Sequence, residues 1–228
     1  MKNLILKHLL IESNINNNFW KWFGNSVTLE KTGEPMIFYH GTPNGQFTVF
    51  DVKPGKTKKT NQQADFGSHF IQDKEFAEEY TQKKKTKTPK LYEVYLKIEN
   101  PLYTNEMIWK EDSPQKFEIY LNFAKKVFGR QFKQIYGGDY YYNKNGEKQD
   151  TYQSIMIGNF HVDRINPNKM YNALLEFNFD GMTHVSYQRS GMRHVKFNMP
   201  SYIVLKPNQI KAIDNDGTWD INDDNIYS

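Results

Sequence analysis

The stretch MIFYHGT, residues 36–42, decides the fold class of this 228-residue chain. Four apolar or aromatic residues in succession are typical of a buried strand, which here ends in a polar tip, His-Gly-Thr. At such a tip lie an imidazole, a glycine backbone that a ligand can approach closely, and a hydroxyl. A buried structural histidine explains the same residues, so the tripeptide alone leaves both interpretations open.

The segments around this strand alternate between helical and extended patterns. Asp73 is a plausible N-cap for a helix through Gln82, with Phe76, Ala77 and Tyr80 on its inner face. The stretch KLYEVYLKI (90–98) alternates as a half-buried strand does, and Asn100-Pro101 ends it. Helices are also expected within residues 1–14, around Trp20 to Phe23, over 113–128, and near 151–159 and 167–177.

The remaining segments complete the fold class. Residues 129–148, with the turn Asn145-Gly146, predict a loop or a small hairpin. After Asp180-Gly181 the chain becomes extended, in MTHVSY, MRHVKF and SYIVL. Helices and strands are mixed, with strands concentrated late, which predicts an α+β domain. We expect an N-terminal helix and linker over residues 1–18 and a single domain over 19–228.

The composition excludes several classes of protein. The chain has no cysteine, which excludes a disulfide scaffold and a thiol nucleophile and fits a reducing cytosol. No apolar run approaches the roughly 20 residues of a membrane helix, and the start MKNLILKHLLIES lacks the cleavage site of a signal peptide. We therefore expect a cytoplasmic protein with no membrane partner.

The net charge is +4, and two runs are rich in lysine, KPGKTKKT (53–60) and QKKKTKTPK (82–90). Such runs attract polyanions through counterion release, although two solvated loops explain them as well. No two histidines have the spacing of a metal-binding motif such as HExxH, and DNDG (214–217) lacks the order of a calcium loop. We expect no metal.

Several motifs follow one another along the chain: WFGNS (22–26), GEPMIFYHGT (33–42), F-x-x-F (47–50), FGSHFIQDKEFAEEY (66–80), YEVYLKIENPL (92–102), DG (180–181) and YIVLKPNQIKAIDNDGTWD (202–220). This order resembles the ADP-ribosyltransferase domains of phage polyvalent proteins and MuF-type proteins. The resemblance covers nearly the whole chain. It implies a split β-sandwich with flanking helices that holds NAD as the donor of ADP-ribose, in the host bacterial cytosol if the protein is phage-encoded.

Relatives use a His, Tyr, Glu set on three separate strands. The resemblance places the first position at His40, which would bond the ribose hydroxyls of the adenosine half. Gly41 would present backbone donor and acceptor groups to the nicotinamide carboxamide, with Thr42 beside it.

The second position departs from the family's pattern Y-F-T-D-x-x-x-x-A. His69 stands in the place of the tyrosine and Phe70 follows it, while Tyr80 lies further along the chain. The resemblance implies that all three residues belong to the NAD-binding site. The resemblance implies that the rings of His69 and Tyr80 sandwich nicotinamide, since an imidazole can stack as a flat ring. Core packing on a helix face is the other explanation for Tyr80.

The third position departs as well, because Ser201 precedes the strand Tyr202-Ile203-Val204 where relatives have Glu. A serine can bond the nicotinamide ribose but brings no negative charge to the cationic sugar of the transition state. Removing one such stabiliser costs about 2.7 to 4 kcal/mol. Gln209 is an alternative catalytic group, with a structural role at the sheet edge as its other explanation, and Asp180 is an alternative acid.

Three hypotheses for the function follow. The first is a mono-ADP-ribosyltransferase that moves ADP-ribose from NAD to a macromolecule, either protein or nucleic acid. The second is a module that binds NAD with little or no turnover, supported by Ser201 and His69 together. The third is a nucleic-acid-binding protein that uses the lysine runs and the tyrosine-rich loop around residues 140–142.

Overall fold

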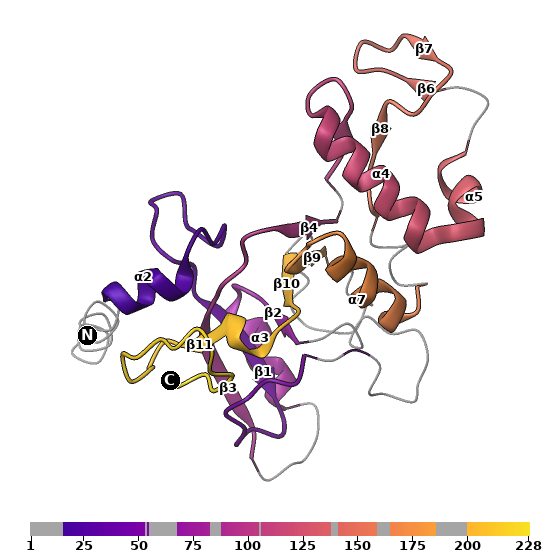
Figure 1. Cartoon of the computed structure of the whole chain (residues 1–228). Helices are drawn as coiled ribbons and strands as arrows, with labels where there is room; N and C mark the ends of the chain where they lie inside the picture. Colours follow the sequence, from indigo (N-terminus) through magenta and orange to yellow (C-terminus); the bar gives the residue numbers. More distant parts are fainter. Residues whose placement is uncertain are drawn as a thin grey trace.

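Two β-sheets, and the segments that cross between them, form the centre of the computed structural model (Figure 1). The structure describes residues 16–52, 54, 68–82, 88–104, 106–137, 141–158, 165–185 and 200–228. The helix expected within residues 1–14 and the strand expected at MRHVKF (192–197) lie outside the described residues. None of the described helices combines the length and the apolarity that crossing a bilayer requires.

The first sheet contains the strand that ends in His-Gly-Thr. Its spatial order is β1 (Phe38–Thr42), β3 (Lys90–Leu96) and β11 (Ile210–Ala212), and both pairings are antiparallel. His40 lies opposite Tyr92, and Phe38 lies opposite Val94. Phe38, Tyr92 and Val94 are buried, which confirms the strands predicted from the apolar run and from the alternating pattern.

The second sheet contains the strand that begins with Pro200-Ser201. Its order is β2 (His69–Phe70), β10 (Pro200–Val204), β9 (Gly181–Val185) and β4 (Pro101–Tyr103). β4 runs parallel to β9, whereas the other two pairs are antiparallel. The break predicted at Asn100-Pro101 is therefore a change of sheet, because Pro101 starts β4 in the second sheet. This mixture of two sheets and several helices confirms the α+β fold class.

Two helices flank the first sheet. α2 (Asn17–Phe23) is capped by the Asn16 side chain, which accepts hydrogen bonds from the backbone N–H groups of Asn18 and Phe19. α2 therefore crosses the border expected between residues 18 and 19. α3 (Lys74–Thr81) is capped by Asp73, whose Oδ1 accepts from Phe76 N at 2.9 Å, as its sequence pattern predicts.

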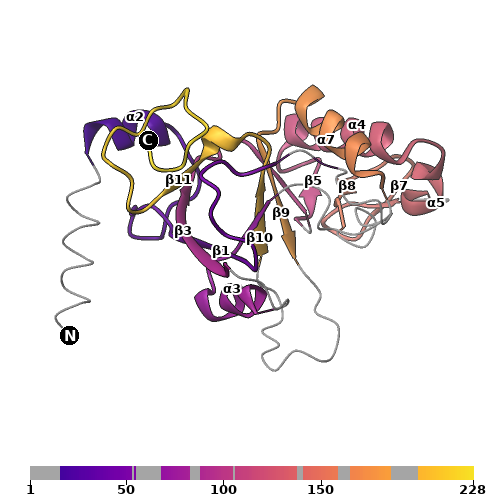
Figure 2. The ribbon, with the colours of Figure 1, turned by 90° about the horizontal axis from the view of Figure 1, so that it is seen from below.

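A lobe of helices and short strands lies between β4 and β9 in sequence and to one side of both sheets in space (Figures 1 and 2). Its elements are β5 (Ile108–Trp109), α4 (Pro114–Phe128), η2 (Gly129–Gln131), α5 (Phe132–Tyr136), β6 (Tyr141–Tyr142), β7 (Lys148–Gln149), β8 (Ser154–Ile155) and α7 (Pro167–Glu176).

The lobe confirms some predictions and corrects one. α4, α7 and the β6–β7 hairpin occur where the sequence predicts them, while α5 lies in a stretch expected to be irregular. The helix predicted near 151–159 is wrong in its described part, because β8 pairs with β5 instead. Ile155 and Ile157 alternate and are both buried, a period of two that suits an extended chain.

The second sheet buries both of its faces. Ile203 and Leu205 pack into the core of the lobe, whereas Val204 and Phe70 pack into the core shared with the first sheet. Figure 2 shows β9 and β10 standing between the lobe and the elements β1, β3 and α3. The sheet that carries Ser201 is therefore held from both sides.

The C-terminal segment closes the first sheet around a buried lysine. Lys211 on β11 is 0% exposed, and its Nζ donates to the carbonyls of Asp223 and Asn225 at 2.9 and 2.8 Å. A backbone bond from Ile226 N to Thr48 O, at 2.9 Å, then ties this segment to the loop that follows β1. The C-terminal segment thus supports the end of the strand that carries His40.

Candidate functional site

His40 is anchored by one ring nitrogen, and this anchor fixes its tautomer. Its Nδ1 lies 2.8 Å from the backbone oxygen of His69. A carbonyl can only accept, so Nδ1 carries the proton, and Nε2 of the neutral ring is left as an acceptor. The ring packs against Phe50 and Phe70, with centroids 5.1 and 5.4 Å away. Burial lowers the pKa of His40 and outweighs the bond to His69, which raises it, so the ring is neutral at neutral pH.

Gly41 lets helix α3 approach the end of β1. A Cβ added to Gly41 would lie 1.7 Å from the Ala77 oxygen and 3.2 Å from the Cβ of Tyr80. No other residue fits this contact without moving α3, so glycine is required here for a close backbone approach. The contact brings Tyr80 beside the His-Gly-Thr tip. Burial, with a smaller effect of Glu79, raises the pKa of the Tyr80 phenol, which is therefore neutral.

Ser201 lies on β10, one strand away from His69. Ser201 is 2% exposed, and its Oγ is 3.5 Å from Nδ1 of His69. The pairing of Ile203 with His69 sets the two side chains on a diagonal, where they can meet. Because His69 also contacts His40, three strands bring together residues that are far apart in the sequence.

A short bridge joins the two sheets at this point. Tyr39 N donates to Ile71 O at 2.7 Å, and Ile71 N donates to Tyr39 O at 3.1 Å. The bridge lies next to His40 on one strand and just beyond Phe70 on the other. The bridge fixes the register of β1 against β2, and this register allows the bond between His40 and His69.

A comparison with models of protein families gives one decisive finding. Residues 30–219 match the family described as ADP-ribosyltransferase in polyvalent proteins. The chain belongs to this family. The matched range spans both sheets and contains His40, His69 and Ser201. Comparisons with curated proteins and with solved structures gave no match.

The other residues predicted to bind NAD differ in their exposure. Thr42, at the last position of β1, accepts a hydrogen bond from Asn44 N at 3.2 Å and is partly exposed. Phe70 is one of the residues predicted to bind the cofactor, but its ring is 0% exposed and supports the His40 ring from within the core. Phe50 has the same supporting role, and only its F-x-x-F spacing after the strand indicated it in the sequence.

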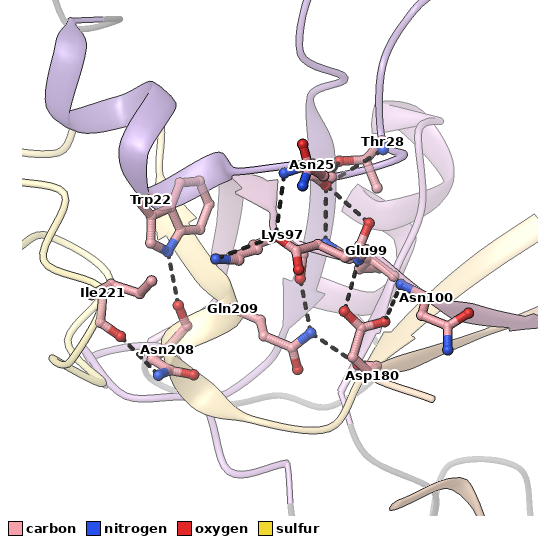
Figure 3. A network of polar contacts seen from close by, with 12 residues as sticks. Trp22, Asn25, Thr28, Lys97, Glu99, Asn100, Asp180, Asn208, Gln209 and Ile221 are labelled. Atoms are coloured by element: carbon pink, nitrogen blue, oxygen red, sulfur yellow. Dashed lines mark hydrogen bonds and ion pairs between the residues drawn. The ribbon is translucent and has the colours of Figure 1, made fainter. Parts of the chain in front are cut away.

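Of the two explanations for Gln209, its hydrogen bonds favour the structural role at the sheet edge. Its Nε2 donates to Lys97 O and Asp180 O at 2.8 and 2.9 Å (Figure 3). Its Oε1 accepts from Leu205 N and Lys206 N at 3.0 and 2.8 Å. These four bonds use the two donors and two acceptor sites of the amide. Gln209 therefore has a structural role at the opposite end of β10 from Ser201.

Asp180, the alternative acid, is part of the same structural network. Its Oδ2 accepts from Glu99 N at 2.7 Å, and its Oδ1 accepts from Asn100 N at 2.8 Å. Both carboxylate oxygens thus hold the turn between β3 and β4 (Figure 3). Asp180 lies at the turn between β3 and β4, and both of its carboxylate oxygens are engaged there, which gives no support to a catalytic role.

The structure describes three further histidines and the two lysine runs only in part. The backbone of His184 lies opposite Ser201 in the sheet, while His161 and His194 lie outside the described residues. Most of the two lysine runs lies there too, at residues 53, 55–60 and 83–87. Within the described ranges, no group of three or more His, Asp or Glu side chains is arranged to hold a metal ion.

Proposed function

We propose that this chain is an NAD-dependent mono-ADP-ribosyltransferase that modifies a macromolecule. The observation that carries the proposal is the contact chain from His40 to His69 to Ser201, with distances of 2.8 and 3.5 Å, across three strands. The resemblance places the His, Tyr, Glu set of the relatives at these three positions. Family membership supports the transfer of ADP-ribose. We propose NAD as the donor and a macromolecule as the acceptor.

The side chains suggest a role for each part of the site. Nε2 of neutral His40 accepts a hydrogen bond from a hydroxyl of the adenosine ribose. Gly41 offers its backbone to the nicotinamide carboxamide, and the rings of His69 and Tyr80 flank the nicotinamide. In the reaction, the bond between the ribose C1 carbon and nicotinamide breaks, and a nucleophile of the acceptor bonds to C1 while losing its proton. Ser201 bonds the ribose without supplying charge.

A second function has a specific observation in its favour. Ser201 is a neutral hydroxyl at the place where relatives carry a carboxylate, and it is 2% exposed. A chain that lacks this countercharge can bind NAD and turn it over slowly or not at all. NAD binding without transfer is therefore the alternative to an active transferase.

Incubation with NAD labelled in its adenosine half, together with a bacterial lysate, separates these functions. Label that is released by protease identifies a protein acceptor, and label that is released by nuclease identifies a nucleic acid. Label that is never incorporated, together with NAD binding in calorimetry, supports the binding module. Absence of both labelling and binding contradicts the proposal. A His40→Asn variant is the control for labelling that depends on this site.

A further inference from the structure

The chain passes between the two sheets at one end of the sandwich. Between β3 and β4 it leaves the first sheet for the second, and between β10 and β11 it returns. These two crossings are adjacent, because Lys97 N donates to Gln209 O at 2.8 Å. The start of β9, at Asp180-Gly181, lies at the same junction.

One side chain binds all three segments of this junction. The amide of Gln209 donates to Lys97 O and Asp180 O (Figure 3). It also accepts from Leu205 N and Lys206 N at the end of β10, so it joins the first sheet to two strands of the second. Gln209 is only 6% exposed. Water cannot easily replace a lost bond in such a place, so the junction depends on the amide itself.

Asp180 adds a second clamp to the junction. Its carboxylate accepts from Glu99 N and Asn100 N, and its backbone N donates to Asn100 O at 3.1 Å. Asn100 in turn donates from Nδ2 to Asn178 O at 2.8 Å. Because Asp180 O also accepts from Gln209, both clamps belong to one network.

The junction acts on the site through the length of β10. Ser201 lies four residues before Leu205, which is about 13 Å along an extended strand at about 3.3 Å per residue. A rotation of the sheets by about 5° at the junction would therefore move Ser201 by about 1 Å relative to His40. A displacement of that size in a reacting site can reduce the rate by about 100-fold.

We propose that Gln209 is a positioning residue that sets the angle between the two sheets, and with it the separation of His40 from Ser201. The predicted effect of Gln209 on kcat rests on the proposed function, whereas its effect on the angle between the sheets does not. It assigns to Gln209 an effect on the reaction that requires no contact with the donor or the acceptor.

The main test replaces Gln209 by Glu, which keeps the shape but loses both N–H donors and sets a carboxylate against Lys97 O and Asp180 O. The expected result is a kcat for nicotinamide release that is about 10- to 100-fold lower, with a smaller change in KM. The control is Val127→Ala, which removes buried side-chain volume from α4 in the lobe. The proposal is overturned if Gln209→Glu and Val127→Ala lower Tm by the same amount and also have the same kcat.

A distance measurement tests the same proposal without any turnover. The chain has no cysteine, so spin labels attached to Glu75→Cys on α3 and Glu118→Cys on α4 are the only ones present. Both positions are exposed, and the two helices pack on the first sheet and on the lobe side of the second. Gln209→Glu should shift or broaden the distance between the labels, and Val127→Ala should not.

The outcomes separate the two proposals. If Gln209→Glu shifts the distance while the wild-type chain neither releases nicotinamide nor binds NAD, the result supports the positioning role of Gln209 and contradicts the proposed function. An unchanged distance overturns the positioning role, whatever the activity. If Gln209→Glu does not fold, Asp180→Ala weakens the exposed part of the same network. It should change the distance and kcat in the same direction but less, and an Asp180→Ala protein with neither change also overturns the proposal.

Discussion

At the scale of the residue, the proposed function gives the two ring nitrogens of His40 different tasks. Nδ1 donates to His69 O at 2.8 Å and connects the first sheet to the second. Nε2 has no proton in this tautomer and is the atom available to a ribose hydroxyl. Structural and binding interpretations of this histidine, both open from the sequence, thus apply to different atoms of one ring.

Two substitutions of His40 separate these tasks. In Asn the side-chain nitrogen can occupy the place of Nδ1, and in Gln the terminal amide can reach the place of Nε2. We expect His40→Asn to keep the higher Tm and to lose more NAD affinity, and His40→Gln to do the opposite. Each lost hydrogen bond should cost about 0.5–1.5 kcal/mol. Calorimetric titration with NAD and thermal unfolding measure the two effects. Identical behaviour of the variants in both measurements contradicts the division of tasks.

The lowered pKa of His40 predicts a dependence of stability on pH. Burial, the larger cause, disfavours the protonated ring in the folded chain, whereas the unfolded chain protonates near the ordinary value of 6.5. The unfolded state therefore binds more protons between the folded pKa and 6.5. The contribution of His40 to the free energy of unfolding is therefore complete above pH 6.5 and is lost as the pH falls below that value. The free energy of unfolding of the wild type should fall more between about pH 7.5 and 5.5 than that of His40→Asn, measured in urea. Parallel pH profiles would show that His40 does not titrate in this way.

Ser201 determines how fast the proposed reaction can run. Ser201→Glu restores a carboxylate at the third position and should raise nicotinamide release by about 100- to 1000-fold, from about 2.7 to 4 kcal/mol of electrostatic stabilisation. Ser201→Gln has the same shape without the charge and is the matched control. A folded Ser201→Glu that releases nicotinamide no faster than Ser201→Gln would show that β10 does not carry the catalytic carboxylate position.

At the scale of the element, the contact between α3 and β1 brings Tyr80 to the His-Gly-Thr tip. The N-cap of α3 is a local residue, Asp73, which directly precedes the helix. The position of the helix depends on Gly41 of β1, because only a glycine there allows the helix backbone to lie against the strand. Tyr80 also makes an edge-to-face contact with Phe76, with centroids 5.5 Å apart. The helix is thus prepared locally and positioned by a glycine on another element.

Gly41→Ala tests this positioning. The added methyl group meets the Ala77 oxygen, so α3 must move, and we expect NAD affinity to fall at least about 10-fold, or about 1.4 kcal/mol. Gly146→Ala in the β6–β7 turn is the matched control, because its φ of 79° strains an alanine while nothing lies within 4 Å of the added Cβ. It should lower Tm and leave NAD binding unchanged. Equal NAD affinity in the two variants would remove α3 from the site.

At the scale of the whole molecule, the second sheet links two hydrophobic cores. One core lies between the sheets and the other lies in the lobe, and neighbouring residues of β10 belong to different ones. Because the lobe packs on the sheet that carries Ser201, the stability of the lobe and that of the sheet are coupled. We therefore expect the described parts of the chain to unfold as one unit, as the proposed single domain over residues 19–228 requires.

A core substitution in the lobe checks this coupling. Phe123 is 0% exposed and makes ring contacts with Phe177 and Phe179. Phe123→Ala should lower the free energy of unfolding by about 3–5 kcal/mol and should keep a single calorimetric transition. Hydrogen exchange should accelerate in β1 and β3 as well as in α4. Two separate transitions, with β1 and β3 still protected, would show instead that the lobe is an independent domain.

The sequence by itself determined the family, the fold class and most local elements of this protein. Caps, apolar periodicity and the order of motifs are local signals, which is why α3, α4, α7, β1, β3 and β10 follow from them. The sequence could not separate a strand from a helix at Ile155, because the pairing of β8 with β5 is a long-range choice. Nor could it show Phe70 as a core residue or Gln209 as part of a junction, since both depend on how two sheets meet. Only the tertiary structure decided that His40 and Ser201 each contact His69, because strand register and hydrogen bonds between distant segments set those contacts.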